Sequence, residues 1–542
     1  MSEDGLDVLL IGIDAGCPDV FDRLSETNSI PTLETLTAEG TSGSLESQVP
    51  PWTPSAWPSL YTGVNPGKHG VFGFVSYDGY DWHVSSADHV DERTLWELLD
   101  EQGKSSVVVN APVTYPPPSI DGAILPGFIG PEEPRCHPEG TFDEVREALG
   151  EYRVYPEYAR GDDSYSEAEK MDEYETLVRM RGEAFRYLAG EHDPDFGFVQ
   201  FQKTDTVFHE FGGDWEKVRR VYEATDDEIH QILEEHDPDT VFVASDHGMG
   251  KYEGYEFRVN DYLEDEGVVE TTLGGKGMPS WNPIRQDLRE GKDVDSWEPG
   301  VVEKVASGAA KVGLTASRIR KALERVNLED VALRYAPADV ARTGNEQVDF
   351  PSSTGYLRSR TELGVRLNVE GRDPSGEVSP EEYDEVRAEI IESLRTVTDP
   401  DGNLVFEEVV PRERYFEGPH TDEAVDIVTI PRDFQYFLSD QVRGEYFAEP
   451  TESWNHKMDG IVAAWGEGVD ASADLSDAHL FDVAPTILAA LGMPTSDRMD
   501  GDVLPAVAST NEHSYREVEA AGEEASPEAA VENRLSDLGY LE

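Results

Sequence analysis

The sequence predicts an α/β protein in which a mostly parallel central sheet carries helices on both faces and an inserted cap interrupts the sheet domain. Three observations predict this class: short apolar runs recur along the chain, helical stretches separate them, and one long segment breaks the alternation. Strands of a parallel sheet are buried on both faces and therefore form continuous apolar runs. With 542 residues, the chain is long enough for a large core and for more than one domain.

Several apolar runs have the length of strands and are rich in β-branched and aromatic residues. They cover residues 8–13, 106–110, 196–201 and 241–244. Between these runs, residues 94–101 and 166–188 are typical of helices. Strands and helices that alternate in this way favour a parallel sheet with helices packed on each side.

A change of pattern divides the chain into parts. Residues 271–350 contain a loop rich in Gly, Pro and Trp and then an amphipathic helix around residues 301–326, which indicates an inserted cap. We therefore expect a catalytic α/β core that begins with residues 1–270, a cap over 271–350, the closing part of the core over 351–508, and a tail over 509–542. The closing part contains a predicted helix at 380–394 between strand-like runs, "GVRLNVEGR" and "AVDIVTIPR". The tail is acidic, polar and rich in Glu and Ala, a composition typical of disorder.

The charge balance is strongly acidic. The chain has 112 Asp and Glu against 44 Lys and Arg, which gives a formal net charge of −68. Because 38% of the residues are hydrophobic and nine are Trp, we expect a folded chain, and we interpret the acidity as the surface of a halophilic protein adapted to concentrated KCl. A basic patch cannot survive this balance, so nucleic acid is excluded as a partner.

Cysteine use and hydropathy bear on the compartment. Cys17 and Cys136 form no C-x-x-C pair, so neither a disulfide framework nor a thiolate zinc site is expected, which fits a reducing cytoplasm. The N-terminus carries acids where a signal peptide carries bases, and no run approaches the ~20 apolar residues of a membrane span. We therefore expect a cytoplasmic protein with no membrane partner, and the sequence leaves its oligomeric state open.

Aspartates and histidines stand at the ends of the predicted strands. Asp14 ends one strand, Asp246 and His247 end another, and Asp205 and His209 follow a third with helical i, i+4 spacing. His456 precedes a further strand, in "SWNHKMDG". Each residue alone could be part of a satisfied turn or a surface histidine. Three Asp and three His at the carboxyl ends of α/β strands, where ligands bind, indicate a site for zinc or manganese rather than calcium.

A metal site of this kind needs a nucleophile, either water or an activated hydroxyl, if it is to transfer phosphoryl groups. The stretch "PPWTPSAWPSLYTGVNPGKHG" offers Thr53 and Ser55 before a predicted helix. By spacing alone, a hydroxyl at this position is more often an N-cap than a nucleophile. The two interpretations are compatible, because a helix N-terminus also favours anions.

Five motifs follow one another along the chain: "IGIDAG", "TPSAWPSLYTGVNPGKHG", "TDTVFH", "SDHGM" and "NHKMDGI". Their order resembles that of the alkaline phosphatase superfamily and, within it, the type I phosphodiesterase/nucleotide pyrophosphatase family. The similarity extends over roughly residues 7–503. It implies an alkaline-phosphatase-like fold and an enzyme that hydrolyses phosphodiester or pyrophosphate bonds in a small phosphate ester.

The resemblance also implies a mechanism and two divalent metal ions, with zinc expected first and manganese second. The threonine alkoxide of Thr53 would attack phosphorus to form a phosphothreonine, which metal-activated water then hydrolyses. The resemblance assigns ligands to two metal sites: Asp14, Thr53, Asp246 and His247 at one, and Asp205, His209 and His456 at the other.

One part of the implied pattern differs in this chain. The resemblance implies a Thr-Phe-Pro-Asn run whose asparagine binds a phosphoryl oxygen, but Ala56 stands in its place. Another donor is therefore needed, and we consider a backbone N–H or Lys203 as the substrate-binding group. His69 also belongs to a motif, and we expect it to be structural.

Two other functions stay open at this point. The first is a phosphomonoesterase or phosphomutase of the same superfamily, which the sequence distinguishes poorly from a diesterase. The second is a binding protein that keeps the fold without catalysis. Such a protein is expected to have lost some of the metal-binding residues, but all of them are present in this sequence. A sulfatase is disfavoured because the chain has no Cys-x-Pro-x-Arg stretch.

Overall fold

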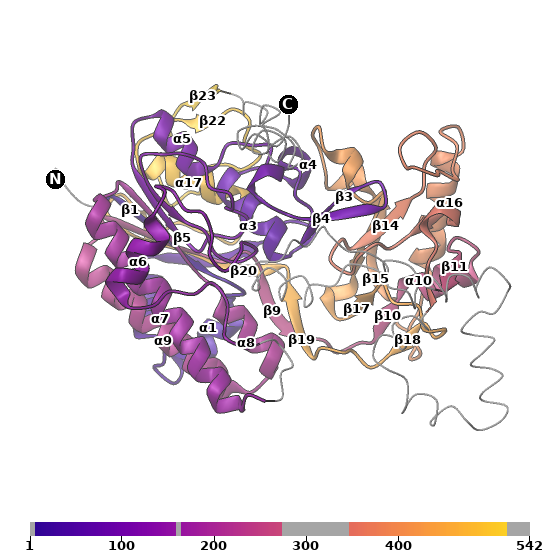
Figure 1. Cartoon of the computed structure of the whole chain (residues 1–542), viewed down its shortest axis with the longest axis horizontal. Coiled ribbons are helices and arrows are strands. Elements are labelled where there is room, and N and C mark those ends of the chain that lie inside the picture. Colours follow the sequence, from indigo (N-terminus) through magenta and orange to yellow (C-terminus); the bar gives the residue numbers. More distant parts are fainter. Residues whose placement is uncertain (1–5, 159–163, 274–345, 517–542) are drawn as a thin grey trace, which may run out of the picture.

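An eight-stranded sheet forms the centre of the larger of two lobes (Figure 1). The computed structural model describes residues 6–158, 164–273 and 346–516. The strands of the central sheet are β1 (Val8–Ile13), β2 (Thr41–Glu46), β5 (Ser106–Val109), β6 (Gly122–Leu125), β7 (Phe196–Phe201), β8 (Thr240–Ala244), β20 (Asp459–Gly466) and β21 (Ala478–His479). Their spatial order is β21-β2-β20-β8-β1-β7-β5-β6, and β20 alone among them runs antiparallel to its neighbours. The predicted mostly parallel sheet is confirmed.

The register of the three middle strands brings their carboxyl ends together. β1 pairs in parallel with β7, Ile13 opposite Phe201, and with β8, Gly12 opposite Ala244. Asp14 and Asp246 each follow two residues after the Gly12–Ala244 pair, so they leave the sheet side by side. The edge at which strands of an open α/β sheet end is where ligands bind.

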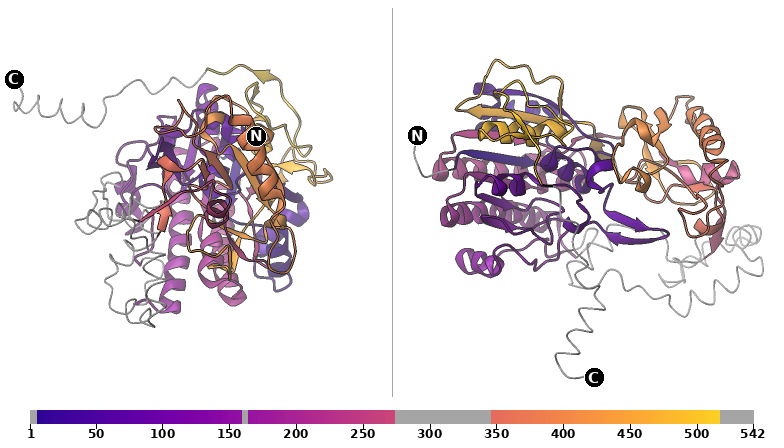
Figure 2. Two further views of the ribbon diagram at one scale, coloured as in Figure 1. Left: turned by 90° about the vertical axis from the view of Figure 1, so that its right-hand side faces the viewer. Right: turned by 90° about the horizontal axis from the view of Figure 1, so that it is seen from above.

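Helices cover both faces of the sheet, as the sequence predicts (Figure 2). One face carries α1 (Pro18–Ser25), α2 (Pro31–Glu39), α6 (Thr141–Leu149), α7 (Glu167–His192), α8 (Lys203–Phe211) and α9 (Trp215–His236). The other carries α3 (Thr53–Thr62), α5 (Leu95–Glu101) and α17 (Val483–Ala490). Along β1, Leu9 and Ile11 enter the first core while Val8 and Leu10 enter the second. Because alternate residues of β1 enter cores on opposite faces of the sheet, every residue of the run is apolar.

The smaller lobe has its own core and its own sheets. Its elements are β10 (Glu256–Arg258), α10 (Val259–Asp265), β11 (Thr271–Leu273), β12 (Glu346–Val348), β13 (Gly355–Tyr356), β14 (Gly364–Leu367), α16 (Tyr383–Arg395), β15 (Phe406–Pro411), β16 (Ile427–Pro431), β17 (Phe437–Ser439) and β18 (Phe447–Ala448). The hairpin of β3 (Val75–Asp78) and β4 (Asp81–Val84) extends from the larger lobe toward it, and β9 (Gly248–Lys251) pairs with β19 (Trp454–Lys457) where the lobes meet (Figure 1).

The smaller lobe corrects one expectation about the closing part of the core. We expected the runs in "GVRLNVEGR" and "AVDIVTIPR" to belong to the closing part of the α/β core, but they form β14 and β16 of a separate antiparallel sheet with the order β13-β14-β16-β15. The predicted helix between them is present as α16. Alternation of strand and helix shows that elements exist, but it does not decide which sheet a strand joins. The chain returns to the central sheet with β20.

Two other expected parts lie mainly outside the described residues. They are the cap at 271–350, of which β11 and β12 are described, and the tail at 509–542, of which β23 (Glu512–His513) is described and pairs with β22 (Thr495–Ser496). The amphipathic helix expected around 301–326 lies outside them entirely. Among the described helices, none combines the length and hydrophobicity that crossing a bilayer requires.

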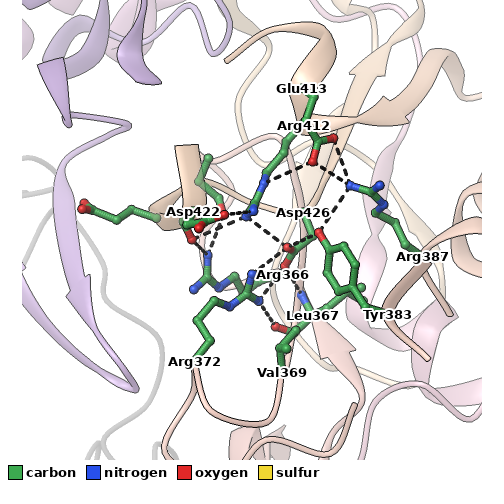
Figure 3. A network of polar contacts seen from close by, with 12 residues as sticks. Arg366, Leu367, Val369, Arg372, Tyr383, Arg387, Arg412, Glu413, Asp422 and Asp426 are labelled. Atoms are coloured by element: carbon green, nitrogen blue, oxygen red, sulfur yellow. Dashed lines mark hydrogen bonds and ion pairs between the residues drawn. The ribbon is translucent and has the colours of Figure 1, made fainter. Parts of the chain in front are cut away.

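A buried aspartate organises the sheet of the smaller lobe (Figure 3). Asp426 is fully buried and accepts hydrogen bonds from the N–H of Leu367, the Tyr383 hydroxyl, Arg372 and Arg412. Burial works against its charge, but the Arg372 guanidinium holds the pKa of Asp426 below its ordinary value. Because Asp426 directly precedes β16 and Leu367 ends β14, this network ties the two strands together.

Another charged contact joins the two lobes. His420 of the smaller lobe donates to Asp91 Oδ2 of the larger lobe at 3.0 Å and lies 2.8 Å from Glu423 Oε1. Its main-chain N–H also donates to Gly67 O, in α4 (Pro66–His69). The hydrogen bonds to Glu423 and Asp91 raise the pKa of His420 to about 9.

This junction predicts a pH dependence of stability. Because the pKa of His420 is raised above its unfolded value, the contact stabilises fully below about pH 6.5 and its contribution is lost as the pH rises through about 9. We expect His420→Gln to lower the free energy of unfolding by about 1 kcal/mol at pH 6 and by nearly nothing at pH 9.5. Denaturant unfolding of both proteins at constant ionic strength measures this. An equal loss at both pH values would contradict it.

Candidate active site and metal centre

Seven predicted residues converge where the strands of the central sheet end. Asp14 follows β1, Asp246 and His247 follow β8, and α8, which follows β7, carries Asp205 and His209 one turn apart on one side. Two residues come from other parts of the chain: Thr53 is the first residue of α3, and His456 lies on β19. All are buried or nearly so.

One group of side chains lies around His247 Nε2. His247 Nε2 lies 3.3 Å from Thr53 Oγ1, 3.2 Å from Asp246 Oδ2 and 3.6 Å from Asp14 Oδ1. Donor atoms of Asp14, Asp246 and His247 lie within 4.8 Å of one another, as a metal site requires. Gln200, next to the last residue of the apolar strand β7, donates to Asp14 Oδ2 at 2.7 Å and so fixes this carboxylate.

A second group adjoins the first. Asp205 Oδ1 lies 3.1 Å from His209 Nε2 and 3.4 Å from His456 Nε2, and the two imidazole nitrogens are 3.0 Å apart. The rings of His456 and His247 stack with centroids 3.6 Å apart. Donor atoms of Asp205, His247 and His456 also lie within 4.8 Å of one another, so His247 stands between the two groups.

The three histidines turn their Nε2 atoms into the site because their Nδ1 atoms are engaged outside it. His247 Nδ1 donates to Gly248 O at 3.0 Å and His456 Nδ1 to Pro51 O at 2.8 Å. His209 Nδ1 lies 3.1 Å from Glu452 Oε2. Partners of this type fix the tautomer of a metal-binding histidine and raise its basicity as a ligand.

Burial governs the charges of the site. It lowers the pKa of His247 and His456, so both imidazoles are neutral, the form that binds metal. Burial, together with neighbouring carboxylates, raises the pKa of Asp14 and Asp246 well above the ordinary value. For the Asp205–His209 pair burial is outweighed: Asp205 raises the pKa of His209 to about 9, and that imidazolium holds the pKa of Asp205 well below its ordinary value.

The residues fit two divalent cations. Asp14 Oδ1, Asp205 Oδ1 and Asp246 Oδ2 are buried oxygens that accept no hydrogen bond from any described residue. Buried carboxylate oxygens without hydrogen-bond donors are costly. The proton of the His209 imidazolium lies between the two imidazole nitrogens, which are 3.0 Å apart. A metal ion in each group would partner the carboxylate oxygens and would take the place of that proton.

Comparison with known proteins decides the family. A model of the type I phosphodiesterase/nucleotide pyrophosphatase family matches residues 8–461. The chain belongs to this family. It is therefore a hydrolase of the phosphodiesterase/nucleotide pyrophosphatase type, as the resemblance in sequence implied. No curated protein matches the chain in sequence.

Solved structures share the fold. Phosphonoacetate hydrolase from Sinorhizobium meliloti 1021, in complex with phosphonoformate, is 14% identical with a TM-score of 0.50, over 90% of this chain and 96% of that one. Wild-type alkaline phosphatase PafA is 14% identical (TM-score 0.48, 91% and 96% covered). Murine ectonucleotide pyrophosphatase/phosphodiesterase 5 is 12% identical (TM-score 0.45, 93% and 97% covered). At 14% identity the likeness to the phosphonoacetate hydrolase shows the fold alone, and together with the central sheet it confirms the expected α/β fold with a mostly parallel sheet and helices on both faces.

The local structure shows that the Thr53 hydroxyl is not the N-cap of α3. Trp52, not Thr53, occupies the N-cap position of α3, and the Thr53 side chain caps no N–H of the helix. Ser55, the other hydroxyl that we considered, is buried and donates to Val71 O at 2.8 Å. Ala56 is fully buried in the core between α3 and the sheet.

The remaining candidates divide into structural and unassigned residues. His69 is buried, bonds Ser59 Oγ at 2.8 Å and accepts the N–H of Val71, so it is structural as expected. Lys203 begins α8, is nearly buried and donates to Gln202 Oε1 at 2.6 Å. Its positive charge opposes the rise in the pKa of Asp14 that burial and the neighbouring carboxylates cause.

Sequence reasoning missed the groups that hold the ligands in place. Gln200 had a signal, since it is a polar residue inside an otherwise apolar strand. Glu452, which orients His209, had none, because its only distinction in the sequence is to stand four residues before His456.

Proposed function

We propose that this chain is a metal-dependent phosphohydrolase that cleaves phosphodiester or pyrophosphate bonds through a covalent intermediate on Thr53. The observation that carries the proposal is the place of the Thr53 hydroxyl, 3.3 Å from His247 Nε2 at the meeting of two Asp/His groups. Membership of the phosphodiesterase/nucleotide pyrophosphatase family supports the same reaction class.

Each Asp/His group is assigned one divalent ion, with Asp14, Thr53, Asp246 and His247 at one and Asp205, His209 and His456 at the other. Carboxylate and neutral imidazole donors favour zinc, with manganese second. Ions bound there would lower the pKa of the Thr53 hydroxyl and offset the charge that develops on the attacking and leaving oxygens.

The covalent chemistry takes two displacements. In the first, Thr53 Oγ1 loses its proton to solvent and bonds to phosphorus, while the bond from phosphorus to the leaving oxygen breaks and that oxygen takes up a proton. In the second, water attacks the same phosphorus, the bond to Oγ1 breaks, and Thr53 recovers its proton. The net result is hydrolysis with the threonine unchanged.

The chain offers two donors for the phosphoryl oxygens. As the first residue of α3, Thr53 presents a backbone N–H that has no acceptor within the helix. Lys203 supplies a cation near Asp14. Both are assigned the role of the asparagine that Ala56 replaces in this chain.

Cleavage of bis-p-nitrophenyl phosphate against p-nitrophenyl phosphate, in high KCl with added zinc or manganese, tests the proposed function. We expect the diester to be cleaved with at least about tenfold higher kcat/KM, a difference of about 1.4 kcal/mol in transition-state stabilisation. Faster cleavage of the monoester would assign a phosphatase or mutase instead. Absence of cleavage of both substrates in metal-loaded protein would favour the non-catalytic binding protein.

A further inference from the structure

An arginine of the smaller lobe lies beside the second Asp/His group. The guanidinium of Arg360 is 3.6 Å from Glu452 Oε1, and the other oxygen of that carboxylate is 3.1 Å from His209 Nδ1. Glu452 therefore links a proposed metal ligand of the larger lobe to a cation of the smaller one. Arg360 also lies over the ring of Phe437, with 5.2 Å to the ring centroid.

The loop that carries Arg360, between β13 and β14, is anchored on both sides of this residue. Arg358 is buried, binds Glu362 with two hydrogen bonds and lies 3.9 Å over the ring of Tyr77, on the β3–β4 hairpin. On the other side, Thr361 packs closely against Gly73. Its Oγ1 lies 3.3 Å from the position that a Cβ of residue 73 would take. The loop thus packs against the segment that follows the helix of Thr53, and the position of Arg360 is defined.

Arg360 itself retains unused donors. Its side chain is 41% exposed, and it makes no hydrogen bond to another residue in the part of the chain that the structure describes. A guanidinium has five N–H donors in a geometry that suits carboxylates and phosphates. In a chain with a formal net charge of −68, a cation at the rim of the site counters the repulsion that an anionic substrate meets.

The geometry of displacement places Arg360 on the side of the leaving group. The attacking and leaving oxygens stand in line on opposite sides of phosphorus. The proposed function assigns Thr53 to the group with Asp14 and Asp246, so an in-line displacement by Thr53 would direct the leaving oxygen toward the group with Asp205 and His456. Glu452 and Arg360 adjoin that second group.

We propose that Arg360 is a specificity-determining residue that binds an anionic substituent, carboxylate or phosphate, on the leaving portion of the substrate. This inference rests on the proposed function and adds to it the charge of the leaving group. Arg360 acts on substrate selection, and the covalent steps at Thr53 do not need it.

Two matched diesters test this selection. Methyl phosphate diesters of 4-hydroxybenzoate and of its methyl ester differ in one leaving-group charge. We expect Arg360→Gln to lower kcat/KM about tenfold to a hundredfold for the anionic diester and less than about twofold for the neutral one. Arg443→Gln is the control, because it removes the same charge from an exposed site that contacts Gln441. Thymidine 5′-triphosphate against p-nitrophenyl thymidine 5′-phosphate repeats the comparison with a phosphate anion, and the pair with the larger effect identifies the anion.

Equilibrium binding gives a readout without turnover. Calorimetry with the metal-loaded Thr53→Ala protein should show that adding Arg360→Gln raises Kd for the anionic 4-hydroxybenzoate diester about tenfold and leaves Kd for the neutral diester unchanged, with Arg360→Lys between. Equal losses for both diesters, or no loss for either, would overturn the role of Arg360 while the proposed function stands. If wild type cleaves no diester of either pair, the proposed function falls and this inference falls with it.

Discussion

Replacing Thr53 by alanine is expected to lower kcat for diester cleavage by at least about 10³-fold while the protein keeps both metal ions. The substitution removes the oxygen that we propose to bond to phosphorus. It leaves the carboxylates and imidazoles of both groups in place, and Thr53 makes no cap contact that α3 would lose. Steady-state kinetics and the metal content of the same preparation, measured by elemental analysis, check the two halves of this expectation.

Thr53→Ser is the matched control for this substitution. It keeps a hydroxyl at the same position and should retain turnover within about one order of magnitude. Full turnover by Thr53→Ala would contradict the account and assign the attack to water. A loss of both activity and metal in Thr53→Ala would show that the hydroxyl serves as a ligand without which the centre does not form.

Replacing His456 by alanine is expected to lower the metal content from about two ions per chain to about one and to reduce turnover by at least about a hundredfold. The group with Asp205 loses one of its nitrogen donors, whereas Asp14, Asp246 and His247 remain. Elemental analysis after dialysis measures the metal content. His230→Ala is the control, because His230 is exposed on α9 and far from any ligand in the sequence.

Two retained ions in His456→Ala would show that the ligands of the second site are assigned wrongly. Loss of both ions would show that the two groups bind as one unit. His247 gives a physical reason for that outcome, since its ring stacks on His456 and the residue belongs to the donor set of both groups.

The ends of the strands could be predicted from the sequence because a strand that is buried on both faces is apolar along its whole length. β1 and β8 are continuous apolar runs, and Asp14 and Asp246 are the first acidic residues after them. Likewise, the i, i+4 spacing of Asp205 and His209 needs only the helix that α8 supplies. Local periodicity thus predicts a common edge for five of the six proposed Asp and His ligands. The assignment of Thr53 came from the order of the motifs, since spacing alone favoured an N-cap.

The smaller lobe and its contribution to the site could not be predicted in this way. β14 and β16 pair across about 60 residues, and nothing in either strand records its partner. Glu452 and Arg360 meet because two loops from different parts of the chain pack together. The burial of Asp426 could not be predicted either. An aspartate in an acidic chain is expected to face solvent, yet Asp426 is buried among arginines.

The stereochemical course at phosphorus tests the central claim, a covalent intermediate on Thr53, most directly. The substrate is one diastereomer of the p-nitrophenyl ester of thymidine 5′-phosphorothioate, hydrolysed in ¹⁸O-labelled water, and the configuration of the product is determined by NMR. Two in-line displacements, first by Thr53 and then by water, invert phosphorus twice, so the account predicts retention. Inversion would contradict it, because a single attack by water would then have cleaved the ester.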